Sequence, residues 1–197
     1  FSVDLKGGTY MSLDVLLERI LFFDTFTRSL VVKLSSPVMD HIFKFITSFG
    51  SGWAFVILGT IISLLLIVNK KSIAAAFLVI CLFTSWRLML VLKLLFGRER
   101  PVGEHLVIAK GLSFPSGHAM VSIAFYGFLI YIITTGRQDR WSRVLAVLIG
   151  IFIFLIGLSR IYLNVHYATD VIAGFLFGAI VLLVFIKIYK WVKSQLV

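Results

Sequence analysis

Long apolar stretches with little polar interruption fill most of this 197-residue chain beyond about residue 50. Hydrophobic residues make up 60% of the sequence and charged residues only 14%, and the mean hydropathy is +1.04. A soluble domain of this size would carry far more charge. Stretches of about 20 apolar residues match the thickness of the hydrocarbon core of a bilayer, and they predict helices rather than strands. We therefore expect an all-α integral membrane helical bundle.

Five membrane spans are predicted from the positions of these stretches. Each is long enough to cross about 30 Å of hydrocarbon with modest tilt. The connections between the later spans are short, so consecutive spans are expected to be antiparallel neighbours. The predicted spans cover residues 53–68, 72–96, 117–135, 143–163 and 170–192.

The first 35 residues have a different pattern, so we divide the chain into an N-terminal segment (1–35) and a membrane domain (36–197). Residues 1–10 are interpreted as a loose lead-in. From 12 to 34, apolar residues recur at helical spacing between charged ones, which predicts an amphipathic helix in the membrane interface. A helix packed over the bundle is an equal alternative. The charged residues in this stretch are Asp14, Glu18, Arg19, Asp24, Arg28 and Lys33.

Basic residues gather on one side of the predicted membrane, with Asp139 as the single acid there. Because loops rich in Lys and Arg stay in the cytoplasm, this side and the C-terminus are expected to be cytoplasmic. The loops 97–116 and 164–169 then lie outside the cytoplasm. The basic residues are Lys70, Lys71, Arg137, Arg140, Arg143, Lys187, Lys190 and Lys193.

The net charge of +10 raises the question of nucleic acid as a partner. We predict no nucleic-acid binding, because the chain has no soluble basic domain and no basic stretch interleaved with stacking aromatics. The lipid bilayer and a lipid substrate are the expected partners. A single cysteine, Cys81, forms no intrachain disulfide and is interpreted as a core residue.

Polar residues gather at the outer ends of four predicted spans and should converge on one patch. Three permanent cations in the patch exclude a metal ion and favour a compact polyanion, and the arginine fork matches phosphate oxygens. A Ser-Gly pair at the start of a helix offers backbone N–H groups and the positive end of the helix dipole. We therefore predict a phosphate site formed by Lys93, Arg100, Ser116, Gly117, His118, Arg160, His166 and Asp170.

Two histidines in this patch have separate predicted roles. His166 and Asp170 are four residues apart, so they can form a hydrogen bond if the last helix begins a turn early. The carboxylate would keep one ring nitrogen protonated and leave the other free as a nucleophile. His118, from another helix, remains free to act as a general acid.

The same residues form a three-part signature: Lys93, six residues, Arg100-Pro101; then Pro115-Ser116-Gly117-His118; then Ser159-Arg160, five residues, His166, three residues, Asp170. This signature resembles that of the type 2 phosphatidic acid phosphatase superfamily. The resemblance covers the chain from about residue 36 to its end.

The resemblance implies a metal-independent reaction without a cofactor. His166 would be the nucleophile through a phosphohistidine, with Asp170 to orient it and His118 as general acid. Lys93, Arg100, Ser116, Gly117 and Arg160 would bind the substrate phosphate. A six-span core is also implied, and its first span is not visible here.

We therefore predict a multi-pass lipid phosphate phosphatase of the cell membrane, with its active site outside the cytoplasm. The expected substrate is a phosphatidyl phosphate or an isoprenyl diphosphate; which lipid, and the oligomeric state, stay open. A lipid phosphotransferase using the same phosphohistidine is the main alternative, and an anion transporter is a weaker one. Arg87, Glu104 and His105 have no assigned role, although Glu104 and His105 belong to the loop above the predicted site.

Overall fold

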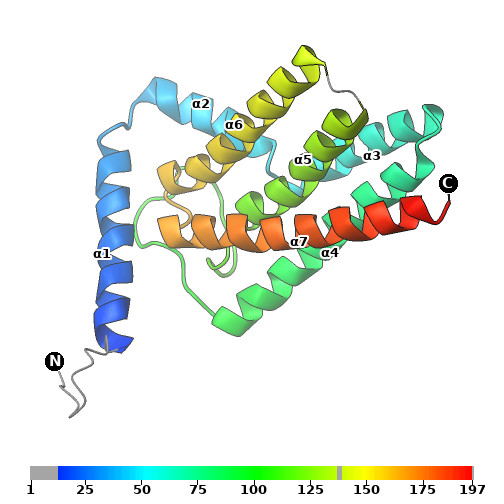
Figure 1. Cartoon of the computed structure of the whole chain (residues 1–197). Helices are drawn as coiled ribbons and strands as arrows, with labels where there is room; N and C mark the ends of the chain where they lie inside the picture. The colour runs from blue at the N-terminus through cyan, green and yellow to red at the C-terminus, as the bar shows by residue number, and fades with distance from the viewer. Residues whose placement is uncertain (1–12, 137–138, 197) are drawn as a thin grey trace, which may run out of the picture.

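The computed structural model describes residues 13–136 and 139–196, and within these ranges it contains seven helices and no strand (Figure 1). The predicted all-α class is therefore confirmed. The helices are α1 (Leu13–Val32), α2 (Pro37–Ser48), α3 (Gly52–Val68), α4 (Ser72–Phe96), α5 (Gly117–Gly136), α6 (Arg140–Tyr162) and α7 (Ala168–Ser194).

Four helices, α4 to α7, are each long and apolar enough to cross a membrane. With 20 to 27 residues at 1.5 Å per residue, they measure about 30 to 40 Å. They match the last four predicted spans, with α7 beginning two residues earlier than expected. The chain is therefore a multi-pass membrane protein.

The first predicted span is only part of a bent pair. Helices α2 and α3 are long and apolar enough to cross a membrane only when taken together, and the pair is bent by 51°. Ser36 caps α2 by accepting a hydrogen bond from the Met39 N–H, and Ser51 caps α3 in the same way. Our span prediction did not include α2, although a serine followed by a proline is a helix-start signal.

Helix α5 is the centre of the bundle and packs closely on α7. Half of the residues in an apolar 18-residue stretch of α5 are buried. In the corresponding stretches of the other three long helices, 22 to 28% of the residues are buried. Gly174 and Gly178 allow the close approach, because a Cβ atom at these positions would lie 2.6 Å from the Ser116 carbonyl oxygen and 2.4 Å from that of Met120. The Ser116 N–H also donates to the Asp170 carbonyl at 2.9 Å. This packing fixes the start of α5 against the start of α7.

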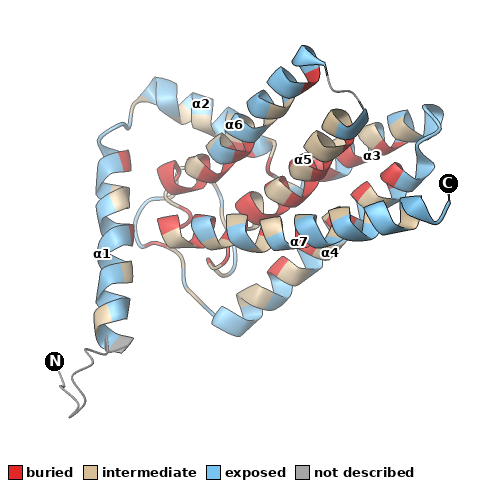
Figure 2. Cartoon of the chain, in the orientation of Figure 1, coloured by how far each residue is buried: buried red, intermediate tan, exposed pale blue. Residues whose placement is uncertain are grey.

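The outer faces of the long helices are exposed (Figure 2), and many of the residues there are large and apolar. Leu94 of α4 and Trp141 of α6 are 79% and 78% exposed. In water such a surface would be unfavourable, whereas in a bilayer it faces lipid tails.

Helix α1 crosses one end of the bundle, near the starts of α7 and of the loop between α4 and α5 (Figure 1). The predicted helix is confirmed, and it packs on α6 and α7. Among its described side chains only Asp24 and Val31 are buried, while Val15, Ile20, Thr27 and Arg28 are partly buried. Its contact with the bundle is therefore narrow and includes a charge.

Candidate active site

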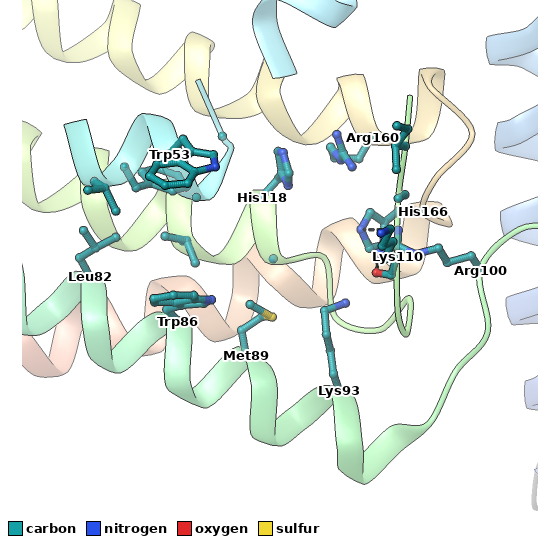
Figure 3. Close-up of a pocket in the computed structure, with 18 residues that line it drawn as sticks. Trp53, Leu82, Trp86, Met89, Lys93, Arg100, Lys110, His118, Arg160 and His166 are labelled. Carbon is teal, nitrogen blue, oxygen red and sulfur yellow. Dashed lines mark hydrogen bonds between the residues drawn. The ribbon is translucent and has the colours of Figure 1, made fainter. Parts of the chain in front are cut away.

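Six of the eight predicted site residues line one cavity of about 620 Å³ at the α1 end of the bundle (Figure 3). They come from five different helices or loops, so only the fold brings them together. These residues are Lys93 of α4, Arg100 of the following loop, Gly117 and His118 of α5, Arg160 of α6 and His166 before α7. Ser116 and Asp170 are buried behind this lining.

His166 and Asp170 are within hydrogen-bonding distance, with 3.4 Å between Nδ1 and Oδ2. The geometry differs from the prediction, because His166 precedes α7 instead of lying in its first turn. Asp170 is the third residue of α7, and its Oδ2 also accepts the Tyr167 N–H at 2.9 Å. The carboxylate therefore turns back toward the loop that carries His166.

The other ring nitrogen of His166, Nε2, faces the cavity and lies 3.3 Å from Arg100 Nη1. Burial lowers the pKa of His166 to about 3, and the positive charges of Arg160, Arg100 and Lys93 act in the same direction, while the hydrogen bond to Asp170 opposes them. The imidazole is therefore neutral at physiological pH. A neutral ring with Nδ1 held by a carboxylate keeps its lone pair on Nε2, and in this structure that lone pair accepts a hydrogen bond from Arg100 Nη1.

Two residues that the sequence analysis missed also hold Asp170. The Ser113 hydroxyl donates to Oδ2 at 2.5 Å and lies 3.3 Å from His166 Nδ1. Arg98 donates to the other oxygen, Oδ1, at 2.7 Å. Neither residue has a defined place in the signature, so no spacing rule pointed to them.

Lys93 and Arg100 hold the loop between α4 and α5 over the cavity. The Lys93 ammonium donates to the carbonyl oxygens of Leu112 and Ser113 at 2.6 and 3.1 Å. The guanidinium of Arg100 donates to three more carbonyls, those of Lys110, Gly111 and Val165, at 2.7 to 3.0 Å. The two cations are therefore fixed in place as well as charged.

Arg160 and Ser116 carry buried polar atoms without a hydrogen-bond partner among the described residues: Arg160 Nε and Ser116 Oγ. Arg160 is 5% exposed, and its Nη1 donates to the Thr47 hydroxyl of α2 at 2.6 Å. An unpaired buried donor is costly, and an anion in the adjoining cavity would satisfy the donor on Arg160.

The first turn of α5 does not match the prediction in every detail. The backbone N–H of Ser116 is occupied by Asp170, so it is not available for a phosphate. Gly117 does line the cavity, and a Cβ there would come within 3.3 Å of the Met89 side chain. His118 lies across the cavity from His166 (Figure 3) and packs on Gly50, where a Cβ would be 2.7 Å from the ring.

Glu104, His105 and Arg87 are outside the cavity lining. The Glu104 carbonyl accepts from Asn164, and His105 Nε2 is 2.9 Å from the Pro101 carbonyl oxygen, so both residues take part in the loop structure. Arg87 is exposed on the outer face of α4.

Lys110, which the sequence analysis did not single out, also lines the charged end (Figure 3), and the rest of the cavity is apolar. Its lining continues from the charged end between α3 and α4 as Trp53, Val56, Leu82, Trp86 and Met89 (Figure 3). One end of the cavity is thus suited to a phosphate and the other to a hydrocarbon chain.

A sequence profile of the PAP2 superfamily matches residues 74–194, which include all eight predicted site residues. The chain belongs to the PAP2 superfamily. The predicted resemblance and the predicted class of enzyme, a membrane lipid phosphatase, are confirmed by this match together with the relatives described next.

The chain is similar to several proteins of this superfamily. It is 29% identical to phosphatidylglycerophosphatase B of Bacillus subtilis (strain 168) over 149 residues, which are 75% of this chain and 73% of that protein. It is 36% identical to undecaprenyl-diphosphatase of Sulfolobus acidocaldarius over 67 residues, 34% of this chain and 29% of that protein. The crystal structure of a transmembrane PAP2 type phosphatidylglycerolphosphate phosphatase from Bacillus subtilis superposes with a TM-score of 0.80 and 25% identity, covering 93% of this chain and 88% of that one.

Proposed function

We propose that this chain removes the terminal phosphate from a phosphatidyl phosphate or an isoprenyl diphosphate through a phosphohistidine formed on His166. The observation that carries the proposal is the two-part cavity. Its charged end contains His166 Nε2 and the guanidinium of Arg160, and its other end is apolar. The substrate phosphate would bind at the first and the lipid chain along the second.

The first chemical step is attack of His166 Nε2 on phosphorus. A P–N bond forms, the P–O bond to the lipid breaks, and His118 donates a proton to the departing oxygen. Lys93, Arg100 and Arg160 stabilise the charge on the phosphoryl oxygens. Asp170 holds Nδ1 protonated and stabilises the positive ring that forms.

The second step regenerates the enzyme. Water attacks the phosphohistidine, His118 accepts a proton from that water, and inorganic phosphate leaves as the P–N bond breaks. An alcohol in place of water would give a phosphotransferase by the same route. Release of inorganic phosphate in place of a new phosphate ester distinguishes the hydrolase from this alternative.

Phosphatidylglycerophosphate is the first substrate to test, because the relative that is similar over 73% of its length is named as a phosphatidylglycerophosphatase. The apolar lining of Trp53, Leu82 and Trp86 supports a lipid over a soluble sugar phosphate. A lipid already in the bilayer gains local concentration and orientation at such a site.

We also propose that the site faces away from the cytoplasm. The cavity is at the α1 end of the bundle and the C-terminus is at the other end (Figure 1), where Lys187, Lys190 and Lys193 lie in the last turns of α7. The positive-inside rule assigns that second end to the cytoplasm.

Phosphate release by the purified protein in mixed micelles tests the substrate proposal. We expect kcat/KM to be highest for phosphatidylglycerophosphate or undecaprenyl diphosphate and at least about 100-fold lower for glucose 6-phosphate in the same detergent. The variant Trp86→Ala should reduce kcat/KM for the lipids and leave that for the sugar phosphate unchanged. Equal efficiency on the sugar phosphate would contradict the proposal.

A further inference from the structure

Asp24 is a buried carboxylate on a helix whose other described side chains are mostly exposed. It is 2% exposed, and it is placed in the middle of α1, away from the free N–H groups at the start of its own helix. A buried charge is costly unless it is paired and hydrogen-bonded. The partners of Asp24 therefore show what this part of α1 is built to contact.

Among the described residues, the hydrogen-bond partners of Asp24 are Thr169, next to Asp170 in the chain, and Arg98, which itself donates to Asp170. Its Oδ1 accepts the Thr169 N–H at 2.9 Å, at the second residue of α7. Its Oδ2 accepts the Thr169 hydroxyl at 2.7 Å and Arg98 Nη2 at 2.6 Å. Asp24 thus caps α7 from another helix, where the positive end of the helix dipole favours a negative charge.

Arg98 connects Asp24 to Asp170. Its Nη2 donates to Asp24, while its Nη1 donates to Asp170 Oδ1 and to the Thr169 hydroxyl, both at 2.7 Å. The guanidinium also lies 4.1 Å from the centre of the Tyr167 ring. Burial alone would lower the pKa of Arg98, but the two carboxylates hold it above its ordinary value. The arginine is therefore a fixed, charged bridge.

The bridge determines how the carboxylate of Asp170 is oriented. Oδ1 is held by Arg98, which leaves Oδ2 for the Tyr167 N–H, the Ser113 hydroxyl and His166 Nδ1. Without Asp24, both Nη1 and Nη2 of Arg98 could donate to Asp170. A bidentate pair of this kind would use both oxygens of the Asp170 carboxylate. Sharing the arginine between two acids restricts it to one oxygen of each.

We propose that Asp24 of α1 and Arg98 are positioning residues for the reaction: together they orient Asp170 so that Oδ2 faces His166. The proposal rests on the proposed roles of Asp170 and His166. It also gives α1 a part in catalysis beyond covering the bundle, because the carboxylate that completes the arrangement comes from that helix.

A purely structural tether is the competing explanation, since Arg28 of α1 also donates to the Val102 carbonyl and so attaches α1 to the same loop. The two explanations differ in one respect. A positioning residue acts through Asp170. Its substitution should therefore not lower kcat further in a variant whose Asp170 has already been replaced. Structural damage would lower the rate in addition.

The test compares steady-state phosphate release by Asp24→Asn, Asp170→Asn and the double variant. We expect Asp24→Asn to lower kcat about 10- to 100-fold with KM within about threefold, because misplacement of a catalytic group by about 1 Å has effects of this size. The double variant should have the kcat of Asp170→Asn alone. Glu18→Gln, which neutralises an exposed acid of the same helix, is the matched control and should retain wild-type kcat.

Unchanged kcat in Asp24→Asn, or losses that multiply in the double variant, would overturn the proposal. Thermal unfolding in detergent establishes that each variant is folded. If Asp24→Asn does not fold, Arg98→Lys takes its place in the same cycle, because lysine keeps the charge but lacks the fork that reaches both carboxylates. A parallel assay of His166→Ala separates this proposal from the proposed function. Activity in that variant would contradict the assignment of His166 as the nucleophile, whereas the result of the double variant concerns only the positioning roles of Asp24 and Arg98.

Discussion

Replacing Gly174 by alanine should separate α5 from α7 at the active site. The new Cβ would lie 2.6 Å from the Ser116 carbonyl oxygen and 3.0 Å from the Ala119 Cβ. Ordinary contacts between such atoms need about 3.5 Å, so the helices have to move apart by roughly 1 Å. Because the first neighbour is backbone, no flexible side chain can give way.

Two consequences follow from that displacement. Overpacking of this kind costs about 1 to 3 kcal/mol of stability. The hydrogen bond from the Ser116 N–H to the Asp170 carbonyl, now 2.9 Å, also lengthens, and the first turn of α5, with Gly117 and His118, moves relative to His166. A displacement of about 1 Å at a catalytic site reduces the rate about 100-fold.

Phosphate release and thermal unfolding of the purified variant measure both effects. Gly150→Ala is the control, because a Cβ at Gly150 in α6 meets nothing within 4 Å. That variant should keep its kcat and unfold no more easily than the wild type. A Gly174→Ala protein with wild-type kcat and unfolding midpoint would refute the reasoning.

Further predictions concern single groups and the sidedness of the protein. Ser113→Ala removes a donor to a buried carboxylate, so chemical unfolding should show a loss of about 1.5 to 3 kcal/mol. Excess chelator should leave phosphate release unchanged and orthovanadate should inhibit competitively, whereas a strict requirement for an added divalent metal would contradict the proposed chemistry. Since the pKa of His166 falls from 6.5 to about 3 on folding, the unfolded chain binds a proton in this interval that the folded chain does not. The unfolding midpoint should therefore drop as the pH is lowered from 6.5 toward 3, and less steeply in His166→Gln. Cysteines that replace Asn69 and Glu104 in a Cys81→Ala background should be accessible to an impermeant reagent from opposite sides of the membrane. Labelling of the cysteine at position 69 from outside intact cells would show that the topology is the reverse of the proposed one.

The sequence was most informative where the chemistry requires fixed residue types at fixed spacings. The outer ends of the long apolar stretches carry Lys93, Arg100, His118, Arg160 and His166, and all five line one cavity. Span length and the antiparallel order of spans were enough to place them at one end of the bundle. The shape of the cavity was not predictable, because it depends on which side chains of α3 and α4 face each other.

Residues that act through tertiary contacts were missed. Arg98 is two residues before Arg100 and has no defined position in the signature, and Ser113 is in a loop of irregular structure. Asp24 has the sequence context of an exposed acid on an amphipathic helix, yet it is buried against α7. Nothing in the local sequence of any of the three indicates the partner that it meets.

The prediction of spans from hydropathy also missed α2 and the bend between α2 and α3. Hydropathy identifies stretches long enough to cross a bilayer, and α2 has only 12 residues, including Asp40, His41 and Lys44. The helix matters for the site because Thr47 accepts a hydrogen bond from Arg160. The sequence indicated its start at Ser36 and Pro37, but it did not indicate its contact with Arg160, for which we propose phosphate binding.

Trapping the covalent intermediate tests the central claim most directly. The purified protein is mixed with substrate labelled with ³²P in its terminal phosphate, quenched in alkaline detergent and digested, and the labelled peptide is identified. We predict a phosphoryl group on His166 that is stable in alkali and lost in acid, and no label in His166→Ala. Label on another residue, or full turnover by His166→Ala, would contradict the account.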